Sequence, residues 1–284
     1  MQRLRGSNSA RITAAVLPAS CAMELTGVTT LVTGANGGIG RALTEALAAR
    51  PLRLVLAGMR DPGRFEPVRG AAAEVRPVRM DLSSRAAIED SCAGLGDALA
   101  GVDLLVNNAG RVTGGLLEEQ DLDEVYAMFQ VNLVATAHLT ARVLPGMVAR
   151  RRGKVVNNAS ISGYAFFPAA STYAASKAGV VALSESLRRE LRGTGVSVLH
   201  LVTPGVDTPM LAETDAIYGR HMDTSGWDKV SPAEWAAKVV AAIEGDARVL
   251  TPRGKTGLAR LAAAGPAALL DRFSARAFSR RPRG

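Results

Sequence analysis

The stretch from Val28 to Leu47, VTTLVTGANGGIGRALTEAL, decides the fold of this chain. Residues 28–34 read as a buried strand and residues 41–47 as the start of a helix, with Gly34, Gly38 and Gly40 in the turn between them. A strand, a glycine turn and a helix N-terminus together can receive a pyrophosphate on backbone N–H groups at the positive end of the helix dipole. The spacing is G-x-x-x-G-x-G rather than the general G-x-G-x-x-G pattern. The stretch therefore predicts a dinucleotide site at the end of the first strand.

The alternation of strand and helix patterns continues along the chain. Helical stretches such as 121–150 and 171–192 separate further buried strands, which we expect at residues 52–57, 74–79, 102–106, 154–158, 196–201 and 247–251. This repetition argues for a parallel sheet covered by helices on both faces. With 284 residues, of which 48% are hydrophobic, the chain can bury one sizeable core, and α/β folds of this length often form a single domain.

A second motif lies in the middle of the chain, where Ser160 precedes Tyr173 and Lys177 follows Tyr173 by four residues. On a helix, positions i and i+4 share a face, so the tyrosine hydroxyl and the lysine ammonium can lie side by side. A free tyrosine has a pKa of about 10, and a nearby positive charge favours the phenolate. We predict that Tyr173 is an acid/base, that Lys177 lowers its pKa, and that Ser160 holds the substrate oxygen, with Ser162 as the alternative serine.

Tyrosine and lysine at this spacing are also typical of a packed ring and a solvated stem, so the order of the two motifs is what carries the interpretation. That order resembles the short-chain dehydrogenase/reductase family. Further markers agree: TGANGGIG at 33–40, Asp81-Leu82, Asn107-Asn108-Ala109-Gly110, Val131-Asn132-Leu133 and Pro204-Gly205. The resemblance covers about residues 24–252 and implies a Rossmann-like α/β fold. Its doubly wound parallel sheet would have seven strands, with the site at their carboxyl ends. One departure is Asn158-Ala159-Ser160, where relatives commonly have two adjacent serines.

The resemblance implies a role for each marker. The pyrophosphate turn would be lined by Gly34, Gly38, Ile39 and Gly40, with Asn36 near the adenosine ribose; Asp81 and Leu82 would flank the adenine. Close approach of the backbone to the cofactor would be allowed at Asn108, Ala109 and Gly110. Tyr173 and Lys177 would contact the cofactor as well, Lys177 through the ribose, and Asn132 would hold a water in a proton relay. In the cofactor-binding loop that begins with Pro204 and Gly205, the backbone of Val206 and the hydroxyl of Thr208 would bind the carboxamide. Each also has a structural interpretation: Asn132 as a helix-interior amide, Thr208 as a helix cap and Asp81 as a turn residue.

The choice between NADP(H) and NAD(H) depends on the end of the second strand. An NAD-dependent enzyme needs a carboxylate there for the ribose 2′-hydroxyl, whereas this chain has Gly58-Met59-Arg60. A guanidinium can bind a 2′-phosphate with two parallel hydrogen bonds. Asp61 leaves the alternative open, because a shift of one residue in the loop would present an acid. We predict NADP(H) in preference to NAD(H).

The substrate class follows from the expected lid at residues 206–230. This lid is rich in apolar side chains, namely Met210, Leu211, Ile217, Tyr218, Met222 and Trp227. Such a lining favours a lipophilic carbonyl or secondary alcohol, although the same residues could only pack the lid. We therefore predict an oxidoreductase that interconverts the two. The alternatives are a catalytically idle NADP(H)-binding sensor or structural subunit, an NAD-dependent sugar or polyol dehydrogenase, and an epimerase or dehydratase.

The net charge of +8 belongs to the ends of the chain. Residues 1–22 contribute +3 and residues 252–284 contribute +7, which leaves the body near −2 and offers no broad basic face for nucleic acid. We expect a disordered extension at 1–22, a catalytic domain at 23–252, and a basic extension at 253–284. The extension would contain an amphipathic helix at 266–280 that either contacts an anionic membrane surface or packs on protein.

The remaining composition sets the expected surroundings of the protein. Cys21 and Cys92 form no disulfide framework, and no apolar run reaches the length of a membrane span, so we expect a cytoplasmic protein, with peripheral membrane contact as an option. The three histidines are scattered, and we expect no metal site. We also expect a homo-oligomer.

Overall fold

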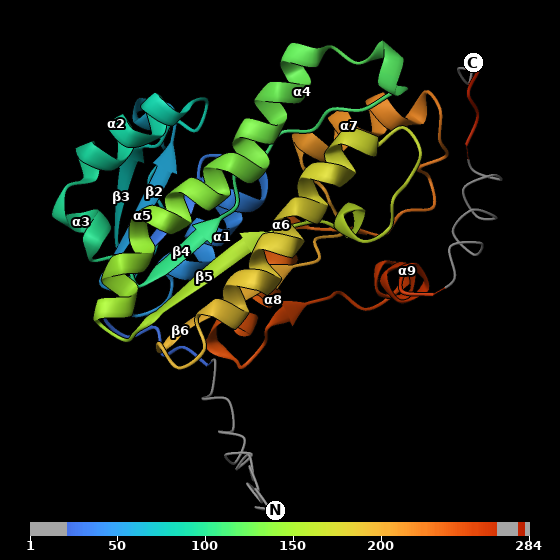
Figure 1. The fold of residues 1–284 in the computed structure, drawn as a ribbon. Helices are drawn as coiled ribbons and strands as arrows, with labels where there is room; N and C mark the ends of the chain where they lie inside the picture. Colours follow the sequence, from blue (N-terminus) through green and yellow to red (C-terminus); the bar gives the residue numbers. More distant parts are fainter. Residues whose placement is uncertain (1–21, 266–277, 282–284) are drawn as a thin grey trace, which may run out of the picture.

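The computed structural model describes residues 22–265 and 278–281, and its centre is a seven-stranded parallel sheet (Figure 1). Every neighbouring pair of strands in this sheet is parallel. In spatial order the strands are β3 (Glu74–Arg79), β2 (Leu54–Met59), β1 (Thr29–Thr33), β4 (Leu104–Asn107), β5 (Gly153–Asn158), β6 (Val196–Leu201) and β9 (Val249–Leu250). The order reverses between β1 and β4, which confirms the predicted doubly wound sheet and places a ligand crevice at that point.

Helices cover both faces of the sheet, and each face has its own apolar cluster. On one face, α1 (Gly38–Ala48) and α8 (Pro232–Glu244) pack against inward side chains such as Val32 and Val106. On the other face, α2 (Arg85–Leu95), α5 (Ala135–Ala149) and α6 (Ser171–Glu190) cover the neighbouring Leu31 and Leu105, as Figure 1 shows for α5 and α6. Because successive strand residues point to opposite faces, one apolar run feeds both clusters.

The expected helix at 121–150 is interrupted in its first half. It consists of α4 (Leu122–Phe129), a five-residue π-helical segment η3 (Gln130–Val134), and α5. A π segment admits one extra residue per turn and often marks a functional site. Asn132 lies at the centre of this segment, so the local widening coincides with a predicted site residue.

The expected lid is a small layer of its own outside the main sheet. It contains a two-stranded parallel ladder of β7 (Gly205–Val206) and β8 (Lys229–Val230), with α7 (Pro209–Gly219) between them. The chain then returns to the body through α8 and β9 and continues into α9 (Lys255–Ala263). The short elements are α3 (Asp97–Ala100) and the 3-10 turns η1 (Pro62–Arg64), η2 (Leu117–Glu119) and η4 (Ile161–Gly163).

The C-terminal residues return to the lid. Phe278 forms an antiparallel bridge with Met222, and the Ser279 N–H donates to the His221 carbonyl at 2.8 Å. The predicted helix at 266–280 is therefore wrong for its last three residues, which are held in an extended bridge, while residues 266–277 lie outside the described part. The predicted extension at 1–22 falls outside it as well, except for its last residue. Over the described ranges, no helix combines the length and the apolar character needed to cross a membrane.

Candidate active site

In the glycine turn between β1 and α1, Gly40 packs so closely on the Gly34 backbone that no side chain fits at position 40. A Cβ on Gly40 would lie 2.0 Å from the Gly34 carbonyl oxygen, and Gly34 and Gly38 have φ values of 67° and 49°. The N-cap of α1 is Gly37, and no side chain caps the first N–H groups of the helix. These N–H groups, at the positive end of the helix dipole, fit the pyrophosphate of a dinucleotide.

The end of β4 is bound tightly to the end of β1. The Thr33 hydroxyl accepts hydrogen bonds from the Asn108 and Ala109 N–H groups, each at 3.0 Å, and the Asn108 amide donates to the Thr33 carbonyl at 3.0 Å. A Cβ on Gly34 would lie 3.1 Å from the Ala109 Cα. The glycine turn and the Asn-Asn-Ala-Gly loop therefore form one surface at the reversal point of the sheet.

Three predicted residues from different elements converge beside this surface. A Cβ on Gly110 would lie 3.3 Å from the Asn132 Oδ1 and 3.7 Å from the Lys177 Nζ. Lys177 is buried on α6, and its Nζ lies 5.7 Å from the centre of the Tyr173 ring, one helical turn away. A larger residue at position 110 would therefore crowd the Asn132 amide and the Lys177 ammonium.

Ser160 completes the predicted set. It is buried at the start of η4, and a hydrogen bond with its hydroxyl favours the phenolate of Tyr173. The Ser160 Oγ also accepts from the Ser162 N–H at 3.1 Å. Ser160, rather than Ser162, is thus the serine that meets the tyrosine.

The pKa of Tyr173 moves against our expectation. Burial raises the pKa of Tyr173 to about 12, and only the Ser160 hydrogen bond opposes this change. Burial also lowers the pKa of Lys177 to about 8. We predicted a lowered tyrosine pKa from the neighbouring charge, but desolvation penalises the charged form of both groups and outweighs that attraction here.

The Asn132 side chain clamps two segments together. Its Oδ1 accepts from the Arg111 N–H at 2.8 Å, and its Nδ2 donates to the Arg111 carbonyl at 3.0 Å and to the Ser176 hydroxyl at 3.1 Å. Ser176 in turn donates to the Tyr173 carbonyl. The amide is thus engaged in joining the β4 loop to α6, which matches the structural alternative for this residue.

Asn158 is a central residue of this region that the sequence analysis treated only as a departure from the family pattern. Its carbonyl accepts from the Lys177 Nζ at 2.9 Å, and its Nδ2 donates to the Asn108 Oδ1 at 3.0 Å. Its Oδ1 accepts from the Thr203 hydroxyl. A chain of side-chain hydrogen bonds therefore crosses the ends of β1, β4, β5 and β6. The available signal was an amide in place of an apolar residue at the end of a buried strand.

The expected adenine end contains an acid, Asp81, and an exposed base, Arg60, whose charge helps to lower the pKa of that acid. The Asp81 carboxylate accepts from the Ser83 N–H at 3.0 Å, and hydrogen bonds from Ser83 are the main cause of its lowered pKa. Leu82 is buried and Asn36 is exposed. Arg60 is exposed, and its guanidinium forms no hydrogen bond with the described residues. Asp61 turns into η1, where it accepts from Gly63 and pairs with Arg64 at 3.2 Å, so it does not neutralise Arg60.

The Pro204–Thr208 loop faces the glycine turn from the other side. A Cβ on Gly38 would lie 3.0 Å from the Thr208 methyl group, while Pro204 and Val206 are buried beside the partly buried Gly205. The Thr208 hydroxyl caps α7 by accepting from the Leu211 N–H at 3.3 Å. The structural alternative for Thr208 is therefore observed, and its methyl group borders the cofactor turn.

An aromatic cluster surrounds Tyr173 on the lid side. Tyr173 packs against a cluster of buried residues that includes Tyr218 and Met222, with Phe167, Ile217 and Trp227 at its edge. The Trp227 ring lies 6.0 Å from the Phe167 ring and 6.2 Å from the Tyr218 ring, centre to centre. Most of the expected lid residues do reach the tyrosine. Leu211 packs on Gly205 instead, Met210 is exposed, and Phe167 was not predicted.

Comparisons with known proteins agree with this arrangement. The Staphylococcus saprophyticus protein described as an uncharacterized oxidoreductase is 33% identical over 198 residues, which cover 68% of this chain and 84% of the relative. The 3-oxoacyl-[acyl-carrier-protein] reductase FabG of Vibrio cholerae is 33% identical over 189 residues, covering 66% and 77%. A crystal structure of a short chain dehydrogenase from Burkholderia cenocepacia in complex with NADP superimposes with a TM-score of 0.73 at 27% identity, covering 89% of this chain and 98% of that one.

A model of the short chain dehydrogenase family matches residues 28–218, which contain the glycine turn, the Asn-Asn-Ala-Gly loop and the serine, tyrosine and lysine set. The fold and the site residues stand in the order that this family requires. The chain belongs to the short chain dehydrogenase family of oxidoreductases.

Proposed function

We propose that the protein is an NADP(H)-dependent oxidoreductase that interconverts a lipophilic carbonyl compound and the corresponding secondary alcohol. The observation that carries this proposal is the convergence of Ser160, Tyr173 and Lys177 beside the glycine surface at the reversal point of the sheet. A catalytically idle relative that binds NADP(H) could also use Lys177 for the ribose, so turnover is the property that separates the two functions.

The chemistry divides between cofactor and protein. When bound, the nicotinamide supplies or accepts the hydride. Ser160 holds the substrate oxygen by a hydrogen bond, and the Tyr173 phenol donates a proton to that oxygen in the direction of reduction. A pKa of about 12 keeps the phenol protonated near neutral pH, which is the form that reduction requires. Lys177, with a pKa of about 8, is mostly charged at pH 7 and can bond ribose hydroxyls.

The remaining predicted residues keep their proposed roles. Asn132 would act in the proton relay, and the loops with Asp81, Leu82, Val206 and Thr208 would enclose the adenine and the carboxamide. The Asn132 side chain is already engaged, so a relay at this position would have to use an ordered water beside the π segment.

Two observations support NADP(H) over NAD(H). Arg60 is exposed and its guanidinium forms no hydrogen bond with the described residues, and the nearby acid Asp61 is bound to Gly63 and Arg64. The Burkholderia cenocepacia relative is described as a complex with NADP. A guanidinium at the end of β2 is suited to a 2′-phosphate, because it provides a planar pair of donors.

The lipophilic substrate class rests on the lining of the site. Tyr173 belongs to the same apolar cluster as Phe167, Tyr218 and Trp227, whose rings offer apolar surface. The Vibrio cholerae relative is named for a 3-oxoacyl substrate, which combines a carbonyl with an acyl chain. A sugar or polyol would need several placed polar groups instead.

The test is a screen of ketones, oxoacyl thioesters, sugars and secondary alcohols, with NADPH, NADH and the oxidised cofactors, followed at the nicotinamide absorbance band. We expect turnover with apolar ketones and NADPH that is lost in Tyr173→Phe. Cofactor binding without turnover of any compound would favour the idle sensor, and turnover of polyols with NAD⁺ would favour the sugar dehydrogenase.

We further propose a homo-oligomer and contact with an anionic membrane through the C-terminal segment. Leu122 and Tyr126 lie one turn apart on α4 and are both exposed, which supports a subunit contact. Leu258 and Leu261 are exposed on α9, and residues 252–284 carry a net charge of +7, which supports the membrane contact.

A further inference from the structure

The turn that begins with Ser160 ends with Tyr164. The Ser160 side chain caps η4 through the Ser162 N–H, and the Ser160 carbonyl accepts from the Gly163 N–H at 3.0 Å. The Tyr164 N–H closes the turn on the Ile161 carbonyl at 2.9 Å. Ser160 and Tyr164 therefore belong to one short hydrogen-bonded turn.

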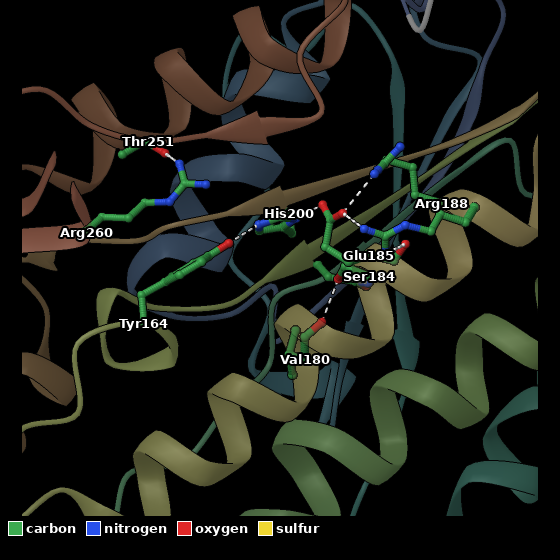
Figure 2. A network of polar contacts seen from close by, with 10 residues as sticks. Tyr164, Val180, Ser184, Glu185, Arg188, His200, Thr251 and Arg260 are labelled. Carbon is green, nitrogen blue, oxygen red and sulfur yellow. Dashed lines mark hydrogen bonds and ion pairs between the residues drawn. The ribbon is translucent and has the colours of Figure 1, made fainter. Parts of the chain in front are cut away.

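Tyr164 is held from two sides by residues that are distant in sequence (Figure 2). Its hydroxyl lies 2.6 Å from the His200 Nε2 on β6, and the Arg260 guanidinium from α9 lies over its ring, 4.7 Å from the ring centre. Arg260 is fixed in turn by a hydrogen bond to the Thr251 hydroxyl. The ring is therefore clamped between the central sheet and the last described helix.

The hydrogen bond between Tyr164 and His200 joins two neutral groups. His200 is 2% exposed, and burial lowers its pKa to about 4, while burial raises the pKa of Tyr164. The other groups that face this pair are Glu185, whose Oε1 lies 3.9 Å from the His200 Nδ1, and Arg188, which pairs with Glu185. In the tautomer that carries its proton on Nδ1, toward Glu185, the Nε2 of His200 accepts a hydrogen bond from the Tyr164 hydroxyl.

The same helix α9 also holds the lid. The Thr256 N–H donates to the Asp228 carboxylate at 3.1 Å, and the Lys255 ammonium donates to the Gly226 carbonyl at 3.0 Å. Residues 226–228 precede β8 and include Trp227 of the aromatic cluster. One end of α9 thus binds the lid, and the Arg260 side chain binds the turn that carries Ser160.

We infer that Tyr164 and Arg260 are positioning residues for Ser160, and that α9 sets the spacing between the lid and the serine turn. The inference rests on the proposed carbonyl chemistry, because Ser160 is the group that would hold the substrate oxygen. Removing Arg260 frees the Tyr164 ring and the end of η4, so the Ser160 hydroxyl loses its fixed distance to Tyr173. The Arg260 side chain contacts Tyr164 and Thr251, so we expect the loss to fall on the substrate step rather than on cofactor binding.

The experiment compares Arg260→Ala with Arg253→Ala. Arg253 is exposed just before α9 and has no hydrogen bond with the described residues. Its replacement by alanine therefore removes the same charge and leaves the contact of Arg260 with Tyr164 intact. A cation over an aromatic ring contributes about 0.5–2 kcal/mol, so we expect kcat/KM to fall roughly 2- to 30-fold in Arg260→Ala. We expect the Kd for NADPH to stay within about twofold, and Arg260→Lys to recover part of the loss, since it keeps a cation over the ring.

A purely structural role would lower Tm while leaving kcat/KM unchanged well below Tm, and this result would overturn the inference. A second readout is independent of turnover: hydrogen exchange at the Ser162, Gly163 and Tyr164 amides should accelerate in Arg260→Ala and in Tyr164→Phe, but not in Arg253→Ala. Equal exchange in all variants would also overturn the inference. Absent turnover in the wild-type chain, with the exchange difference intact, would count against the proposed function alone.

Discussion

At the scale of single residues, burial controls the chemistry of the site more than neighbouring charge does. Tyr173 and Lys177 lie one helical turn apart, yet the pKa of the tyrosine is raised and the pKa of the lysine is lowered, so that both shifts favour the neutral form. The cause in both cases is the removal of water, which penalises the charged form of each group. The phenol is therefore protonated near neutral pH.

The replacement Tyr173→Phe should abolish turnover and preserve cofactor binding. Phenylalanine keeps the ring that packs against the aromatic cluster and removes only the hydroxyl that donates the proton. General acid catalysis contributes about 10²–10⁴-fold, so we expect kcat to fall by at least that factor. Steady-state kinetics and fluorescence titration with NADPH measure the two effects. A phenylalanine enzyme with substantial activity would show that Tyr173 is not the acid.

The replacement Arg60→Ala should weaken NADPH far more than NADH. A hydrogen bond to a charged group contributes about 1.5–3 kcal/mol, which corresponds to roughly a ten- to hundredfold change in Kd. Arg69→Ala is the matched control, because Arg69 is also exposed on the segment that follows β2 and its loss leaves the pair of Asp61 and Arg64 intact. Equal increases in Kd for NADPH and NADH would show that Arg60 does not bind the 2′-phosphate.

At the scale of elements, the site is held by residues that join one element to another. Asn158 links the ends of β4, β5 and β6, Asn132 links the π segment to α6, and Tyr164 links η4 to β6 and α9. Removing one partner of such a hydrogen bond by mutation lowers the free energy of unfolding, because the other partner stays buried without a hydrogen bond. The elements therefore support the catalytic side chains through polar contacts as well as apolar packing.

Acid should destabilise the protein through His200. The pKa of this imidazole is lowered from 6.5 to about 4 by burial, so the unfolded chain takes up a proton between pH 6.5 and pH 4 that the folded chain does not. The stabilising contribution is fully present above pH 6.5 and is lost as the pH falls through about 4. Thermal unfolding should show a loss on the order of 3 kcal/mol over this window.

The variant His200→Gln tests this assignment. Glutamine keeps a polar partner for Tyr164 but does not titrate, so its Tm should fall less than that of the wild type between pH 7 and pH 4. Tyr164→Phe is the control, since it retains the buried histidine and should keep the acid sensitivity. The same pH slope in His200→Gln and wild type would assign the acid effect to other groups.

At the scale of the whole molecule, the exposed apolar side chains suggest contacts beyond the single chain. Tyr126 is 75% exposed and Leu122 is 62% exposed on α4, whereas Leu258 and Leu261 are 67% and 71% exposed on α9. Large apolar side chains that gather on one surface often mark an interface. We predict that α4 forms a contact between subunits and that α9 contacts a membrane.

A homo-oligomer that uses α4 should be disrupted by Tyr126→Glu. A carboxylate placed in an apolar interface lacks a partner and loses its hydration, which weakens association. Light scattering after size exclusion should give a multiple of the mass of the 29.6 kDa chain for the wild type and a smaller mass for the variant. Val148→Glu on α5 provides a second exposed apolar position for comparison. A wild type that elutes as a monomer would contradict the prediction.

Membrane contact through the C-terminal segment should depend on both Leu258 and Leu261 and on salt. We expect the full chain to co-sediment with phosphatidylserine-containing vesicles at low salt, and less so in the double replacement Leu258→Ser and Leu261→Ser. Salt should weaken binding, because charges are screened over about 8 Å at physiological ionic strength. Neutral phosphatidylcholine vesicles are the control. Equal sedimentation of the wild type and the double variant would contradict membrane contact, and packing on protein would then explain the exposed leucines.

The sequence by itself determined the order of the main strands and helices and the glycine turn after the first strand. These features are local or periodic, so neighbouring residues carry the information. Only the tertiary structure decided the direction of the Tyr173 pKa, the hydrogen bonds of Asn158 and the clamp of Arg260 on Tyr164. The reason is that burial and contacts between distant segments depend on the whole packed chain, since desolvation exists only once the other elements have excluded water.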